Sequence, residues 1–206
     1  MDVALILSLI GFAFMTTITP GPNNFLLMSS GALFGWRKTL PHILGIQFGF
    51  IALLSAFVFG LGLVVDDRPW LVTIAKWIGA AWLFWMAIQF FRTAFHLGRS
   101  NTMPITKAKS RPFRFYEAAL FQWANPKAVI IGLSVGGGFI GLSPSMSLRA
   151  LIISITFLLC GIISSTTWTL AGSYLNRHMS GGRSAMFLNL LMGILLSVTA
   201  ALILSY

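Results

Sequence analysis

Two short motifs combine proline with asparagine inside otherwise apolar sequence. The first is TPGPNN, residues 19–24, and the second is NPK, residues 125–127. Proline supplies no backbone amide donor and glycine allows backbone angles that helices do not use, so each motif is expected to end one helix and start another. The start of a helix presents unpaired amide donors and a partial positive charge, which suit a carboxylate or a phosphate. We therefore expect an anion-binding helix end at each motif.

Capping residues indicate where the new helices begin. Asparagine followed by proline is typical of a helix N-cap with proline in the first helical position, and Asn125 with Pro126 fits this pattern. In the first motif the same role falls either to residues 19–20 or, with a weaker match, to residues 21–22. Each motif is thus predicted to start a half-helix.

The side chains beside the motifs extend this chemistry to a zwitterion. Lys127 adds a formal positive charge for an anion, and the carbonyl groups freed at Ile18, Gln122 and Trp123 are available to an ammonium group. A charged side chain inside a membrane is costly, which favours a functional role for Lys127. The candidate substrate-binding residues are therefore Thr19, Pro20, Gly21, Pro22, Asn23, Asn24, Gln122, Asn125, Pro126 and Lys127.

The composition determines the solvent around these motifs. The 206-residue chain is 57% hydrophobic and only 9% charged, and its mean hydropathy is +0.86. A water-soluble domain of this size could not bury so much apolar surface. Six runs reach the roughly 20 residues that a spanning helix needs, and they cover residues 3–34, 43–65, 70–91, 116–142, 148–175 and 185–205. The predicted fold is an all-α integral membrane protein with six transmembrane helices.

The lengths of the first and fourth runs place both motifs deep in the bilayer. A straight helix over residues 3–34 would be about 48 Å long, so its motif has to interrupt it, and Asn125 lies about 14 Å from the start of the fourth run. Irregular backbone survives at such depth only when it is buried in protein or lines a wet cavity. We expect broken first and fourth helices around a shared site. The alternative is that the prolines only kink the helices and Lys127 extends toward the cytoplasm.

Basic residues are concentrated in alternate connections between the spans. Arg68 and Arg149 fall on one side, and ten fall on the other: Arg37, Lys38, Arg92, Arg99, Lys107, Lys109, Arg111, Arg114, Arg177 and Arg183. The positive-inside rule makes the ten-residue side cytoplasmic and places both termini outside. This distribution explains the net charge of +10 by topology, so no nucleic-acid partner is expected.

One long basic connection divides the single transmembrane domain, residues 1–206, into two blocks. Residues 1–91 and 116–206 hold three spans each, and residues 92–115 form a basic cytoplasmic loop that is expected to be disordered or to lie on lipid. Because three is odd, the two blocks enter the membrane in opposite senses. This is the arrangement of transporters built from inverted repeats.

The motifs and their order resemble those of the LysE/RhtB amino-acid exporter family. TPGPNN is followed by GALFGWRKTLPHILGIQFG and, after the basic loop, by ALFQWANPKAVI. The resemblance covers nearly the whole chain and is strongest to the cysteine and O-acetylserine exporter branch, which shares Asn23 and Asn24. It implies proton-motive-force-driven efflux of amino acids across a bacterial inner membrane. Many relatives have an aspartate where this chain has Asn23, and many continue past NPK into PQF, which is absent here.

Acidic residues limit the substrate class. Asp2, Asp66, Asp67 and Glu117 all lie at predicted span ends, so no buried carboxylate can pair with a dicationic substrate. We therefore expect small neutral amino acids of the cysteine, O-acetylserine, threonine or homoserine type. If protons drive export, Glu117 and Lys127 are the candidate coupling residues.

Two other classes of protein share part of this pattern. A passive channel or facilitator for small polar solutes would have the same helix breaks without coupled transport. A membrane enzyme is less favoured, because no acid or histidine lies in the middle of a span and Cys160 is the only cysteine. We expect no catalytic residue, metal or cofactor. The expected partners are a small-molecule substrate and the lipid bilayer, and a homodimer stays open.

Overall fold

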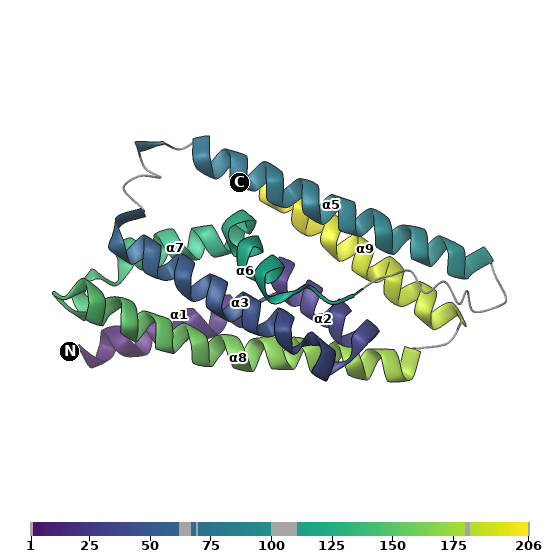
Figure 1. The fold of residues 1–206 in the computed structure, drawn as a ribbon, viewed down its shortest axis with the longest axis horizontal. Coiled ribbons are helices and arrows are strands. Elements are labelled where there is room, and N and C mark those ends of the chain that lie inside the picture. The colour runs from purple at the N-terminus through teal and green to yellow at the C-terminus, as the bar shows by residue number, and fades with distance from the viewer. Residues whose placement is uncertain (1, 62–66, 69, 100–110, 180–181, 206) are drawn as a thin grey trace.

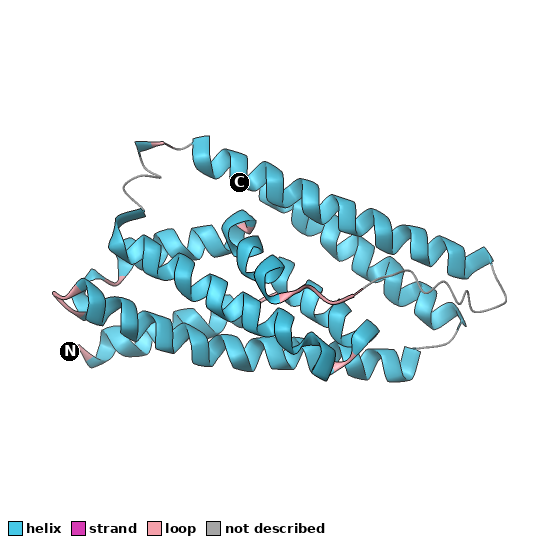
Figure 2. Cartoon of the chain, in the orientation of Figure 1, coloured by secondary structure: helices cyan, strands magenta, loops and turns pink. Residues whose placement is uncertain are grey.

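The structure is a computed structural model that describes residues 2–61, 67–68, 70–99, 111–179 and 182–205. Its regular elements are helices, with no strand among the described residues (Figure 2). In chain order these are α1 (Val3–Ile18), α2 (Pro22–Phe34), α3 (Trp36–Ala56), η1 (Phe57–Leu61), α5 (Trp70–Arg99), α6 (Phe115–Ala124), α7 (Pro126–Gly138), η2 (Ile140–Leu142), α8 (Met146–Met179) and α9 (Gly182–Ser205).

The helices have the length and surface of membrane-spanning elements. In the described part of the chain, three segments are long and apolar enough to cross a bilayer unaided: Trp36–Leu61, Trp77–His96 and Met146–Leu175. The pair formed by α1 and α2 passes the same test together and is bent by 53°. Large apolar side chains such as Trp77, Leu120 and Leu159 are more than half exposed. The prediction of a multi-pass helical membrane protein is confirmed.

Several helices extend beyond the predicted runs. α3 begins at Trp36 instead of residue 43, and α5 continues to Arg99 instead of ending at residue 91. Helical structure therefore covers the first residues of the predicted 92–115 loop, of which residues 100–110 lie outside the described part. Hydropathy locates the apolar middle of a helix, whereas charged residues can continue the same helix into the polar interface. Predictions from composition were for this reason too short at these ends.

The two broken helices each pack against an unbroken helix of the other block. α1 and α2 lie along α8, while α6 and α7 lie along α3 and η1. α5 and α9 form a long pair that runs beside the rest of the bundle (Figure 1). Each broken helix thus packs on a helix of the other three-helix block, and the two breaks face each other in the middle of the bundle.

Glycines allow these cross-block helices to touch through their backbones. Gly31 of α2 and Gly172 of α8 face the backbone of the opposite helix, and Gly45 and Gly49 of α3 do the same toward α6. A Cβ atom at any of the four positions would collide with that backbone. Small residues that permit such close approach are a common basis of helix packing in membranes. These contacts hold the two breaks in register.

Candidate functional site

The first break occupies three residues between α1 and α2. α1 ends at Ile18, and the Thr19 amide donates to the Met15 carbonyl as a C-cap. Gly21 is the N-cap of α2 and Pro22 is its first residue. Of the two predicted helix starts in this motif, the one with Gly21 as N-cap and Pro22 in the first position is therefore correct. Thr19 and Pro20 instead form the linker, because Thr19 is still needed to close the last turn of α1.

The second break is a single residue wide. Asn125 caps the C-terminus of α6 and the N-terminus of α7, and its side-chain oxygen accepts a hydrogen bond of 3.2 Å from the Lys127 amide. Pro126 occupies the first position of α7, where its missing amide donor costs nothing. The prediction of an asparagine N-cap with proline at the next position is confirmed.

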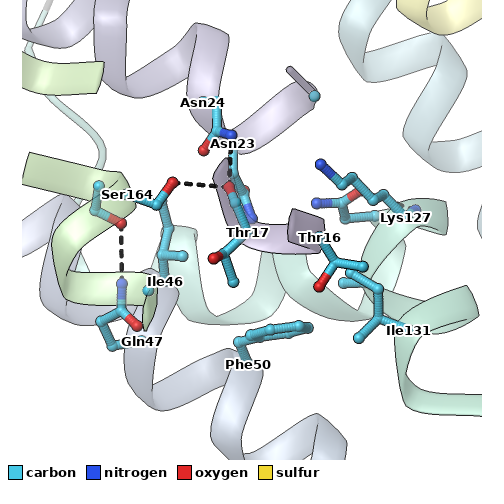
Figure 3. Close-up of a pocket in the computed structure, with 15 residues that line it drawn as sticks. Thr16, Thr17, Asn23, Asn24, Ile46, Gln47, Phe50, Lys127, Ile131 and Ser164 are labelled. Carbon is cyan, nitrogen blue, oxygen red and sulfur yellow. Dashed lines mark hydrogen bonds between the residues drawn. The ribbon is translucent and has the colours of Figure 1, made fainter. Parts of the chain in front are cut away.

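A cavity of about 50 Å³ lies where the two new helices begin. It has room for a few water molecules. Figure 3 shows side chains from both breaks and from α3 and α8 around the space. The lining residues are Thr16, Thr17, Gly21, Asn23, Asn24, Ile46, Gln47, Phe50, Asn125, Lys127, Ala128, Ile131, Gly161, Ser164 and Ser165. The starts of α2 and α7 thus meet at one cavity.

Lys127 links the two breaks directly. Its ammonium donates to the Thr19 carbonyl at 2.7 Å and to the Thr19 hydroxyl at 2.9 Å, with a longer contact of 3.4 Å to the Pro20 carbonyl. Carbonyl groups at the end of a helix carry partial negative charge and attract cations. In this conformation the lysine therefore compensates the end of α1, instead of being free for an anion.

A second link joins the same two segments. The amide groups of Asn23 and Gln122 pair reciprocally, at 2.8 Å from Asn23 Nδ2 to Gln122 Oε1 and 3.2 Å from Gln122 Nε2 to Asn23 Oδ1. Gln122 is fully buried and also donates to the Ala118 carbonyl. Gln122 is not among the residues that line the cavity, so it fixes the position of the Asn23 side chain from outside the cavity.

Carbonyl groups at both breaks are occupied by other donors, and among the predicted acceptors the Gln122 carbonyl accepts from the Asn125 amide at 3.3 Å. The Ile18 carbonyl accepts from the Trp168 indole at 3.1 Å. The Thr17 carbonyl accepts from both Asn24 and Ser164, at 2.9 and 2.7 Å. In this conformation these donors satisfy the polar groups that the break exposes, as burial requires.

Helices α3 and α8 complete the polar wall of the cavity. Gln47 donates to the Ser165 hydroxyl at 2.9 Å, and Gly161 leaves the space that the Gln47 side chain fills. The sequence left open whether Gln47 and the polar run Ser164–Thr167 line a cavity or only form hydrogen bonds between helices, and the structure places Gln47, Ser164 and Ser165 in the lining. No sequence signal marks Gly161, because its role depends on a residue in a distant helix.

Glu117 lies away from this cavity. It forms a bidentate ion pair with Arg111, at 2.5 and 2.6 Å, and also accepts from the Arg114 amide at the start of α6. The hydrogen bond with Glu117 raises the pKa of the Arg111 guanidinium above its ordinary value. The structure therefore does not bring Glu117 together with the other candidate residues.

Comparison with known families agrees with this geometry. The family model described as LysE type translocator matches residues 6–206, which is nearly the whole chain. The chain belongs to this family. A LysE-type translocator moves solutes across membranes and is not an enzyme, so the preference for a transporter over a membrane enzyme is confirmed by the family. The resemblance noted from the two motifs is confirmed as well.

Named relatives of this LysE-type translocator share most of its length. Proteins called cysteine/O-acetylserine efflux protein match at 31% identity in Klebsiella pneumoniae, over 86% of both chains. Proteins of the same name match at 26% in Salmonella paratyphi A and at 27% in Escherichia coli O1:K1, each over 81% of both chains. No solved structure matches the chain.

Proposed function

We propose that the protein is a secondary transporter that exports small neutral amino acids or their derivatives across the bacterial cytoplasmic membrane. The substrate class is of the cysteine, O-acetylserine, threonine or homoserine type, and the names of its relatives point to the first two. The observation that carries the proposal is the meeting of two helix starts at one polar cavity inside a translocator. Helix starts attract carboxylates, which all of these substrates carry.

The substrate binds in place of internal contacts that now occupy polar groups of the cavity. Its carboxylate takes the amide donors at the starts of α2 and α7 together with the Lys127 ammonium. Its own ammonium takes the Thr19 carbonyl and hydroxyl that Lys127 now occupies, while Asn24 keeps its bonds to the Thr17 and Thr19 carbonyls. Because Lys127 exchanges these oxygen atoms for the carboxylate, the exchange leaves neither the ammonium of Lys127 nor Thr19 unpaired. The cavity widens as Lys127 leaves the first break.

The lining of the cavity favours a neutral side chain on the substrate. Among the described residues around it, Lys127 is the only charged one, and none is acidic. A second ammonium group, as in lysine, would enter an unpaired environment beside a positive charge, which is strongly unfavourable. Ser164, Ser165 and Gln47 can instead bind hydroxyl, thiol or ester groups.

We further propose six spans arranged as two inverted repeats. The bent α1–α2 pair corresponds to the α6–α7 pair, α3 to α8, and α5 to α9. The exchanged packing of the two broken helices, on α8 and on α3, has the pattern that a two-fold relation between the blocks requires. The excess of basic residues at one end favours a cytoplasmic location for that end, with both termini outside.

Coupling to the proton-motive force is part of the same proposal. Lys127 is the better candidate of the two coupling residues, because it lies at the cavity and makes contacts that depend on its charge. Glu117 is held ionised by two hydrogen bonds from Arg111. The alternative function, a passive facilitator, would use the same cavity without coupling.

Efflux measurements test the proposal. Cells that express the protein are loaded with labelled cysteine, O-acetylserine, threonine, homoserine or lysine, and efflux is followed with and without an uncoupler. We expect export of neutral amino acids against a gradient, its loss on uncoupling, and its loss in Asn125→Ala and Lys127→Ala variants. Unchanged efflux in both variants would remove the proposed site. Uncoupler-insensitive efflux that stops at equal concentrations would establish the facilitator instead.

A further inference from the structure

A second and larger cavity opens at the end of the molecule where the basic residues gather. Its volume is about 390 Å³, within the range of roughly 300–1,000 Å³ that is usual for small-molecule sites. It lies between α2, the C-terminal half of α5 and the segment that leads into α6. Its lining residues are Leu26, Ser29, Ser30, Leu33, Phe34, His42, Trp82, Trp85, Met86, Phe90, Arg111, Pro112, Phe113 and Glu117.

A buried histidine lines this cavity, and one of its ring nitrogens has no hydrogen-bond partner in the described part of the chain. His42 is only 2% exposed, and no group in the described residues hydrogen-bonds to its Nδ1 atom. Its ring lies against Phe113, with the ring centres 5.0 Å apart. An unpaired buried polar atom is costly unless a ligand or water satisfies it. In either tautomer Nδ1 offers one hydrogen bond, as an acceptor for an ammonium or as a donor to a carboxylate. Because the atom is covered by protein in this structure, a ligand reaches it only when the ring turns or the groups over it move.

Two side chains of opposite charge line the same cavity. Arg111 and Glu117 both line it and are paired with each other, with side chains 49% and 28% exposed. A partly exposed ion pair contributes little to stability and is readily exchanged for another pair. A zwitterion can make this exchange without leaving a charge unpaired, because its carboxylate replaces Glu117 at Arg111 and its ammonium replaces Arg111 at Glu117.

The remaining wall suits the uncharged part of such a ligand. Trp82, Trp85, Met86 and Phe90 form an apolar and aromatic surface. Such surfaces bury aliphatic, thioether or ester groups, and the tryptophans also favour a nearby ammonium. The cavity thus combines the two charges of an amino acid with an apolar surface for its side chain.

The cavity borders the central site along two helices. On α2, Asn23 and Asn24 line the central cavity, whereas Leu26, Ser29 and Ser30 line the larger one. Asn24 and Ser29 are about 7.5 Å apart along the helix axis. On α6, Glu117 lines the larger cavity and precedes Gln122 by five residues, and Gln122 pairs with Asn23, which lines the central one. We call the larger cavity the vestibule.

We propose that the vestibule is a second amino-acid site, in which Arg111, Glu117 and His42 bind the zwitterion before it passes the Asn23–Gln122 pair to the central cavity. This inference rests on the proposed export of amino acids and adds where the substrate is first recognised. An alternative occupant is a lipid acyl chain, which would need neither the charges nor the histidine.

Binding to purified full-length protein in phospholipid nanodiscs tests the vestibule. We expect radiolabelled O-acetylserine to bind the unsubstituted protein at both sites, a Lys127→Gln variant at the vestibule alone, and an Arg111→Gln or Glu117→Gln variant at the central cavity alone. In everted membrane vesicles, Arg111→Gln should raise the KM at the cytoplasmic face by about tenfold, as loss of a charge-assisted contact implies. Arg114→Gln is the matched control, because it removes the same charge nearby and does not line the vestibule.

The outcomes separate the two proposals. If Arg111→Gln and Glu117→Gln keep both binding sites and an unchanged KM, the vestibule is not an amino-acid site, although export through the central cavity stands. If folded Lys127→Gln protein binds no amino acid, the same conclusion holds and the cavity belongs to lipid. If the unsubstituted protein neither binds nor exports any amino acid, the proposed function fails, and the vestibule inference fails with it.

Discussion

The paired amides of Asn23 and Gln122 give the sharpest test of how the two blocks are joined. They connect the start of α2 to the end of α6 through two reciprocal hydrogen bonds. The perturbation is a double-mutant cycle that consists of Asn23→Ala, Gln122→Ala and the double variant. The quantity of interest is the coupling energy between the two side chains in the free energy of unfolding.

The structure allows the size of each step to be worked out. Asn23→Ala leaves the Gln122 Oε1 atom without its donor at a fully buried position, while Nε2 keeps its bond to the Ala118 carbonyl. One buried orphan acceptor costs about 1–3 kcal/mol. Gln122→Ala leaves Asn23 beside a cavity with room for water, so the orphan cost there is smaller. Because the double variant has no orphan, we expect a coupling energy of about 1–2 kcal/mol.

Equilibrium unfolding in mixed micelles measures these energies. Ser134→Ala is a matched control, since it removes an exposed polar group whose hydrogen bond stays within its own helix turn. It should change stability by less than about 0.5 kcal/mol. Additivity of the two single substitutions within about 0.5 kcal/mol would show that the amides are not coupled. The interpretation of the pair as a tie between the blocks would then be wrong.

Three further predictions concern the packing and the site. Gly31→Ala should lower the thermal unfolding temperature, since the added methyl group collides with the α8 backbone, whereas Gly11→Ala meets open space and should stabilise the helix slightly. Equal effects of the two would argue against close α2–α8 contact. Asn23→Asp places a carboxylate at the cavity, which can pair with a second ammonium group. The ratio of lysine efflux to efflux of neutral amino acids should therefore rise about tenfold. An unchanged ratio would contradict this prediction. Gly161→Ala pushes the Gln47 side chain toward the cavity and should raise the KM for larger substrates more than for serine in vesicle uptake.

The positions of the breaks could be predicted because their causes are local. Pro126 lacks an amide donor, and Asn125 supplies a side-chain acceptor to the amide two residues later, so this break follows from three adjacent residues. The first motif offered two local solutions, and composition could not choose between them. The choice of Gly21 as N-cap follows from how the end of α1 is closed by Thr19, which depends on the geometry of both helices.

The partners of the site residues could not be predicted, because they are separated by half of the chain or more. Lys127 contacts Thr19 across 108 residues, and Ser164 reaches the Thr17 carbonyl across 147. From the sequence, the positive charge of Lys127 predicted that it binds the anionic group of the substrate. Its present role in satisfying the end of α1 depends on the packing that brings the two breaks together.

The sequence by itself determined that the chain lies in a lipid bilayer, that it is helical, which family it belongs to and where its helices break. These properties follow from apolar content and from proline and asparagine, whose effects extend over one or two helical turns. Only the tertiary structure decided which polar groups meet at the central cavity, that Glu117 lies apart from it, and that His42, whose Nδ1 has no partner among the described residues, lines a second cavity. Such contacts depend on the close approach of helices from both blocks, and no local pattern specifies that approach.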